Sequence, residues 1–104
     1  MSNNVRWTRT GYIKNSRVME AIAWSKEICG WAQKKHNVTV ETWLDAAGQP
    51  NTIRWTADYA DIASFDAKMT AVMMDPEYWT YVQKAYKDDL FVDNTTVDTL
   101  SKKF

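Results

Sequence analysis

Residues 37–58, with the sequence NVTVETWLDAAGQPNTIRWTAD, decide the fold because they predict a β-hairpin. Residues 38–45 and 52–58 alternate between two kinds of side chain, as half-buried strands do, and residues 46–51 connect them. Because successive side chains of a strand point to opposite faces, each strand has one set suited to burial. Those two sets consist of Val38, Val40, Thr42 and Leu44, and of Ile53, Trp55 and Ala57.

One pairing register of the two strands places apolar side chains opposite each other on one face and opposite charges on the other. Placing Glu41 opposite Arg54 also places Val40 opposite Trp55. A slip of one residue would move every apolar side chain to the polar face. We therefore predict that Glu41 and Arg54 form a cross-strand ion pair on the polar face.

The rest of the chain predicts two more strands and two helical regions. They are a strand over residues 5–13, a helix over about 17–35, a helical region that begins at the cap Ser64, and a strand over residues 90–100. Asn15 or Ser16 would cap the start of the first helix, and Asn37 its end. Asp75 followed by Pro76 signals a new helix start, so a kink or a second short helix is expected there.

The predicted order, β-α-β-β-α-β, is the signature of the ferredoxin-like sandwich. We expect residues 1–104 to form a single α+β domain, a four-stranded antiparallel sheet with two helices on one face. The first strand would turn Val5, Trp7 and Ile13 toward those helices. Arg9 belongs to the same set, and the sequence offers no reason for a charge there.

Composition narrows the classes of function. Thirteen basic and thirteen acidic residues balance, so no electrostatic attraction to nucleic acid or to an anionic membrane is expected. The single cysteine cannot form an intramolecular disulfide, the first residues are polar, and no apolar run approaches the ~20 residues of a membrane span. A cytoplasmic location without membrane association is the expectation. Six Trp, five Tyr and three Phe suggest a large-residue core, an aromatic interface or a pocket.

The sheet face away from the helices carries a mixed set of side chains. It comprises Arg6, Thr8, Tyr12, Thr39, Glu41, Trp43, Arg54 and Thr56. The large rings of Tyr12 and Trp43 favour burial, whereas the charged groups do not. A second copy stacking its own sheet there would bury the rings, so we expect a homodimer with two-fold symmetry.

Two segments carry a resemblance to a known group of proteins. They are WTADYADIASF at residues 55–65 and MDPEYW at residues 74–79, which read as a strand end, a helix cap and a helix restart. With the order of elements, they resemble the dimeric α+β barrel superfamily, and most of all NIPSNAP-like and stress-responsive barrel proteins. That superfamily includes cofactor-independent monooxygenases, isomerases and haem-degrading enzymes. No catalytic residue set is common to it, so the resemblance implies a fold and a dimer but no single activity.

Five residues of the bare face are the candidate ligand-binding set, namely Arg6, Tyr12, Glu41, Trp43 and Arg54. They would orient a small, partly aromatic or acidic molecule in a cavity between sheet and helices. An ion pair of Glu41 with Arg54 that binds no ligand explains the same charges. The alternative functions are a cofactor-independent monooxygenase or isomerase that uses Glu41, Arg54, Tyr12 and His36, and a structural protein without a ligand. No cofactor or metal is expected.

We expect structural roles for the other residues that could take part in chemistry. His36, the only histidine, is expected to cap a helix end or lie on the surface rather than act as a base. Cys29 lies on the apolar stripe of the first helix and is expected to be a buried, unreactive thiol. The carboxylates of Asp88, Asp89, Asp93 and Asp98 lack metal-loop spacing and are interpreted as solvated surface.

Overall fold

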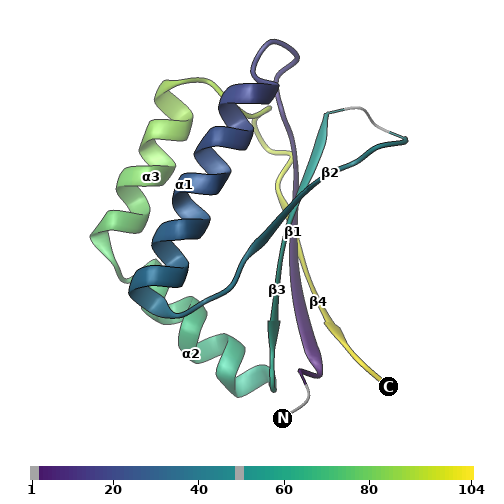
Figure 1. Cartoon of the computed structure of the whole chain (residues 1–104), viewed down its shortest axis with the longest axis vertical. Helices are drawn as coiled ribbons and strands as arrows, with labels where there is room; N and C mark the ends of the chain where they lie inside the picture. The colour runs from purple at the N-terminus through teal and green to yellow at the C-terminus, as the bar shows by residue number, and fades with distance from the viewer. Residues whose placement is uncertain (1–2, 49–50) are drawn as a thin grey trace.

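A computed structural model describes residues 3–48 and 51–104 of the chain (Figure 1). Its elements in order are β1 (Val5–Tyr12), α1 (Val18–His36), β2 (Glu41–Leu44), β3 (Thr52–Tyr59), α2 (Ile62–Met73), α3 (Pro76–Lys87) and β4 (Val97–Lys102). No helix in the described ranges is long and apolar enough to cross a membrane.

The strands form one antiparallel sheet in the order β2-β3-β1-β4, with all three helices on one side of it (Figure 1). Placing β1 and β3 at the centre is the ferredoxin-like arrangement, so the predicted α+β fold is confirmed. The region predicted to hold a kink or a second short helix contains two helices, α2 and α3. Asp75 accepts from the backbone N–H of Glu77 (3.0 Å) and Pro76 opens α3, as the sequence indicated.

Two of the predicted helix caps are wrong. α1 begins after Arg17, whose side chain makes no capping hydrogen bond, rather than after a cap at Asn15 or Ser16. α2 begins after Asp61, whose carboxylate accepts from the backbone N–H of Ser64 (2.7 Å), so Ser64 lies inside the first turn. A carboxylate there also meets the positive end of the helix dipole. The predicted end of α1 is confirmed, since Asn37 adopts the left-handed conformation at φ 53°.

The hairpin register differs from the prediction by two residues. Glu41 lies opposite Thr56, and Trp43 lies opposite Arg54, so the predicted Glu41–Arg54 pair is wrong. The backbone N–H of Asp45 donates to the carbonyl of Thr52 (3.0 Å), which closes the hairpin with a longer loop than that register allows. Part of the predicted connection, residues 49 and 50, lies outside the described residues. A shift of two residues keeps every side chain on its predicted face.

Two strands have different bounds from those predicted. β2 is shorter than residues 38–45, and β4 begins at Val97 rather than at Leu90. Asn94 takes a positive φ of 61°, which interrupts an extended strand between Phe91 and Val97. Phe91 keeps only an isolated bridge to Ile13.

The core lies between the sheet and the helix layer, with Ala85 of α3 among its buried members. Its buried members include Val5, Trp7, Ile13, Ala21, Val38, Ile53, Trp55, Ala57 and Leu90. The apolar face predicted from strand alternation is therefore confirmed, apart from Leu44, which is exposed at the sheet edge.

Helix α3 packs against α1 and α2, and its Ala85 belongs to the buried core. Other side chains of α3 and of the central strands line a common space between the two layers.

Candidate ligand-binding cavity

The space under α3 is a cavity of about 850 Å³. Small-molecule sites typically occupy about 300–1,000 Å³ and are lined mostly by apolar and aromatic side chains. The apolar and aromatic lining comes from both layers and comprises Trp7, Trp24, Ile28, Trp31, Ala32, Val38, Val40, Trp55, Tyr59, Met69, Val72, Tyr78, Trp79, Val82, Ala85, Tyr86, Phe91 and Val92.

Five of the six tryptophans line this cavity, and each of their indole N–H groups is already bonded within the protein. The five donations run from Trp7 to Asp98 Oδ2 (3.2 Å), Trp24 to Tyr81 O (2.9 Å), Trp31 to Glu77 Oε1 (2.7 Å), Trp55 to Ser25 Oγ (3.0 Å) and Trp79 to Met73 O (2.7 Å). Because these donors are used, the rings offer hydrocarbon and π-faces to the cavity.

Arg9 is the charged group of the sheet wall. Its Nε and Nη2 donate to the two carboxylate oxygens of Asp98 on β4 (2.7 and 2.9 Å), and its guanidinium lies 5.2 Å from the centre of the Trp7 ring. Its Nη1 donates to the hydroxyl of Tyr78 on α3 (3.2 Å), which bridges the two layers. Burial alone would lower the pKa of Arg9, but Asp98 and Tyr78 outweigh it and raise that pKa. Burial likewise opposes ionisation of Asp98, yet Arg9 and Trp7 hold its pKa below the usual value.

Three of the other polar side chains in the lining are Tyr59, Cys29 and Lys68. Burial raises the pKa of the Tyr59 phenol. Burial also raises the pKa of the Cys29 thiol, although a contact with Thr42 Oγ1 (3.6 Å) partly opposes the shift. Lys68 Nζ donates to the carbonyl of His36 at the end of α1 (2.9 Å). All three groups are neutral or already bonded to the backbone, so none of them is an activated nucleophile.

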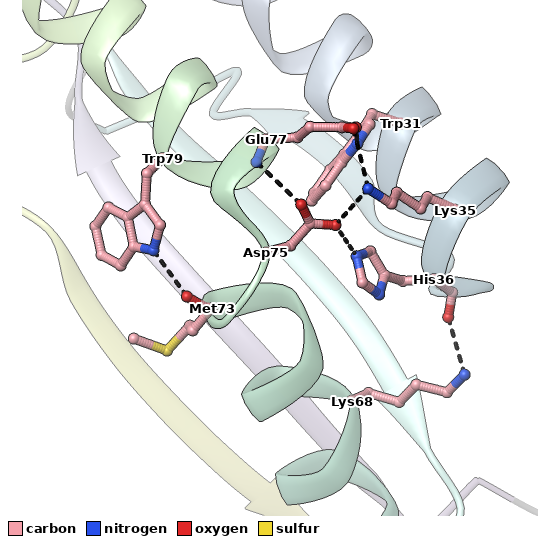
Figure 2. Close-up of polar contacts among 8 residues, drawn as sticks. All are labelled: Trp31, Lys35, His36, Lys68, Met73, Asp75, Glu77 and Trp79. Carbon is pink, nitrogen blue, oxygen red and sulfur yellow. Dashed lines mark hydrogen bonds and ion pairs between the residues drawn. The ribbon is translucent and has the colours of Figure 1, made fainter.

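A polar cluster at the junction of the three helices holds α3 in place (Figure 2). The carboxylate of Asp75, on the corner between α2 and α3, contacts Lys35 Nζ (2.9 Å) and His36 Nε2 (2.8 Å) at the end of α1. Lys35, and after it the Glu77 N–H and His36, lower the pKa of Asp75 to about 2, although burial opposes them. Lys35 also reaches Glu77 (3.0 Å), so the start of α3 is tied to α1. Tyr78 and Trp79 follow directly, and the cluster therefore positions one wall of the cavity.

The five residues singled out from the sequence lie on the opposite face of the sheet. Arg6 pairs with Asp58 (2.8 Å) and Arg54 with Asp45 (3.0 Å), both in exposed positions. The Trp43 indole donates to Thr56 (3.0 Å) and is 53% exposed. Tyr12 and Glu41 are also exposed on this face, and none of the five lines the cavity.

The other sequence interpretations have mixed outcomes. His36 is not a surface residue, because its side chain is 14% exposed and lies against Asp75 and Trp31. Asp98 is no free surface carboxylate, since it holds Arg9. Cys29 is half-buried rather than fully buried, and burial raises the pKa of its thiol. Among residues 3–48 and 51–104, no three His, Cys, Asp or Glu side chains gather in a metal-binding arrangement.

Sequence reasoning missed Arg9 and Tyr78 as cavity residues. One signal was available for Arg9, because a charge in the inward-facing set of a strand requires an inward-facing partner. Asp98 could have been that partner only if the last strand and its register had been placed correctly. Tyr78 carries no comparable signal, since its role depends on the separation of α3 from the sheet.

Neither the protein-family models nor the curated proteins gave a match to this sequence. Solved structures did. A NIPSNAP-like domain protein from Burkholderia xenovorans has a TM-score of 0.81 at 13% identity, over 100% of this chain and 88% of that one. A NIPSNAP family protein from Agrobacterium tumefaciens has a TM-score of 0.77 at 11% identity, over 100% and 89%. A candidate antibiotic biosynthesis monooxygenase from Deinococcus radiodurans has a TM-score of 0.72 at 10% identity, over 96% and 92%. The chain therefore has the fold of NIPSNAP-domain proteins, and the predicted resemblance is confirmed as a likeness of fold.

Proposed function

We propose that this protein binds a flat, largely apolar small molecule in the cavity between α3 and the sheet. The observation that carries the proposal is the cavity of about 850 Å³, which is lined by side chains of the sheet and of all three helices. Five indole rings with bonded N–H groups make its walls apolar without leaving polar atoms unpaired. Such walls favour a ligand with an extended planar body.

Binding accounts for the cavity better than the enzymatic alternative. A cofactor-independent oxygenation or isomerisation requires a base within reach of the substrate. The carboxylates of the lining are Asp89 and Asp93, which are both exposed, and Asp89 already pairs with Lys14 (2.6 Å). The raised pKa of Cys29 makes its thiol a poor base at neutral pH. We therefore place ligand binding first, and the likeness to the Deinococcus radiodurans protein adds no residue to a catalytic case.

Filling the cavity is the direct test. Val82 is a half-buried lining residue of α3, so Val82→Trp should place a large ring in the space and abolish binding of 2-ethylnaphthalene, followed by quenching of tryptophan fluorescence. Met19→Trp adds the same ring at an exposed position of α1 outside the cavity and should leave binding unchanged. Native mass spectrometry of protein taken from cells would then search for a co-purified compound. Failure of the wild-type protein to bind any planar apolar probe would contradict the proposal.

We also propose that two copies associate through the bare face of the sheet. Tyr12 and Trp43 expose aromatic surface there, and the neighbouring charges are already paired in Arg6–Asp58 and Arg54–Asp45. Because these charges are already paired within each chain, bringing the two faces together would not bury unpaired charges. Sedimentation should give a dimer at micromolar concentration, and Trp43→Ala should shift the equilibrium toward the monomer. A wild-type monomer under these conditions would refute the association without affecting the cavity proposal.

A further inference from the structure

We infer that the cavity selects a neutral planar ligand that carries a hydrogen-bond acceptor oxygen, such as a carbonyl, and that the Tyr78 hydroxyl is the group that recognises it. This inference rests on the proposed binding function and adds the chemical class of the ligand. It follows from the direction of the hydrogen bonds around Arg9.

The Tyr78 hydroxyl has a hydrogen to give. A guanidinium can only donate, so in the contact between Arg9 Nη1 and Tyr78 (3.2 Å) the phenol oxygen is the acceptor. Its own hydrogen then requires an acceptor elsewhere. Among residues 3–48 and 51–104 the Tyr78 hydroxyl donates to no atom, and its side chain lines the cavity. The unused donor therefore belongs to a side chain that lines the space that a ligand would occupy.

Arg9 strengthens this donor and fixes its position. A phenol that accepts a hydrogen bond from a cation becomes a better donor, because successive hydrogen bonds polarise one another. The guanidinium itself cannot move freely, since Asp98 holds it at both Nε and Nη2. Arg9 is thus a positioning residue, and Tyr78 makes the contact with the ligand.

The charges and hydrogen-bonding groups of the cavity wall limit which polar group a ligand can carry. Asp98 compensates the charge of Arg9, so this ion pair has no net charge to attract an anion, and the Lys68 ammonium in the lining already donates to the His36 carbonyl. The five lining indoles have no free N–H, and the lining carboxylates Asp89 and Asp93 are exposed to solvent. Among residues 3–48 and 51–104 the Tyr59 hydroxyl also lines the cavity without a hydrogen bond to the protein, but only the Tyr78 hydroxyl is held by a cation. A carbonyl oxygen of the ligand would therefore meet its strongest donor at Tyr78.

Two ligands of matched size test the inference. 2-Acetylnaphthalene and 2-ethylnaphthalene are both planar and neutral, and they differ by a carbonyl in place of a methylene group. Wild-type protein should bind 2-acetylnaphthalene about tenfold more tightly, as one net hydrogen bond predicts. Tyr78→Phe should reduce this ratio to about one while the affinity for 2-ethylnaphthalene stays the same. Tyr86→Phe, on the same helix and also lining the cavity but 74% exposed, should keep the tenfold ratio.

Several outcomes would overturn the inference, and they differ from failure of the proposed function. If wild-type protein binds both compounds equally, or if Tyr78→Phe keeps the preference, Tyr78 does not recognise an acceptor although the cavity binds ligands. Tighter binding of 2-naphthoate than of 2-acetylnaphthalene would show that the site selects an anion. Binding of neither neutral compound would instead contradict the proposed function itself.

A second measurement uses only the wild-type protein, in case Tyr78→Phe does not fold. The carbonyl stretching frequency of bound 2-acetylnaphthalene should lie below its value in an alkane solvent, because a hydrogen bond to oxygen weakens the C=O bond. A frequency equal to the alkane value would contradict the inference.

Discussion

Both faces of the sheet carry tryptophan and arginine side chains, but the surroundings of these side chains differ between the two faces. On the covered face, Trp55 is buried, and Arg9 is held by Asp98 while it reaches across to α3. On the bare face, Trp43 is half exposed, and Arg54 pairs with Asp45 in contact with solvent. The difference comes from the helix layer, which covers one face only and encloses the cavity there (Figure 1). Residue type alone therefore does not identify the site, and the position of the helices does.

The largest expected difference between the faces is in stability. Trp55→Ala should lower the free energy of unfolding by about 3–5 kcal/mol, because it removes a buried ring and leaves a cavity. Trp43→Ala should lower it by about 1 kcal/mol or less, since that ring stays largely in solvent. Urea denaturation under conditions in which both variants sediment as monomers measures the two values. Equal losses would mean that the two faces are not buried differently.

Filling the cavity should protect the thiol of α1 that lines it. The Cys29 thiol lines the cavity and has a raised pKa, so it should react slowly with N-ethylmaleimide at neutral pH. 2-Acetylnaphthalene at about ten times its Kd should slow labelling by a further factor of about ten, because it occupies most of the molecules. Labelling followed by intact mass spectrometry measures the rate. An unchanged rate with bound compound would place the ligand away from Cys29.

Lowering the pH should destabilise the protein more through the buried carboxylate of Asp75 than through the exposed carboxylate of Asp58. Asp75 has a pKa of about 2 in the folded protein against an ordinary 3.8, so its ionised form stabilises the fold. That contribution is present above about pH 4 and disappears as the pH falls toward 2. Asp75→Asn should be less stable than wild type at pH 5 and should lose less on acidification. Asp58→Asn removes an exposed bare-face ion pair and should follow the wild-type profile closely.

Urea midpoints at several pH values between 5 and 2 measure these profiles. If Asp75→Asn lost stability as steeply as the wild type, the helix junction in Figure 2 would not depend on the ionised carboxylate.

The smallest effect is expected from charge removal on the bare face. Glu41→Gln lies across the sheet from the cavity and should change the affinity for 2-acetylnaphthalene by less than about twofold. Titration by tryptophan quenching measures this value. A tenfold loss of affinity would indicate that the ligand binds at the bare-face residues predicted from the sequence.

The sequence predicts well which face of the sheet each side chain lies on. It predicts poorly which residues pair across neighbouring strands. Alternation in residues 52–58 assigns Ile53, Trp55 and Ala57 to the covered face, as observed. The same alternation allows registers that differ by two residues, so it could not separate Glu41–Arg54 from the Asp45–Arg54 pair that forms. Loop length decides between them, and it depends on the backbone of the turn.

The site was harder to predict than the fold for a physical reason. A bare sheet face with charges and rings can be recognised from a strand pattern, whereas a cavity depends on how far a helix stands from the sheet. Nothing in the sequence of α3 specifies that distance. Asp75 does contribute to it, and its cap signal was recognised, but its contacts with Lys35 and His36 join residues far apart in the chain.

The six indole N–H groups provide the most direct test of the central claim, because five line the cavity and Trp43 lies on the opposite face. In a two-dimensional ¹⁵N–¹H spectrum, titration with 2-acetylnaphthalene should shift the indole signals of Trp31 and Trp79, whose ring centres lie 6.5 and 5.1 Å from that of Tyr78, and leave that of Trp43 in place. A shift of the Trp43 signal with the cavity tryptophans unmoved would contradict the account and move ligand binding to the bare face.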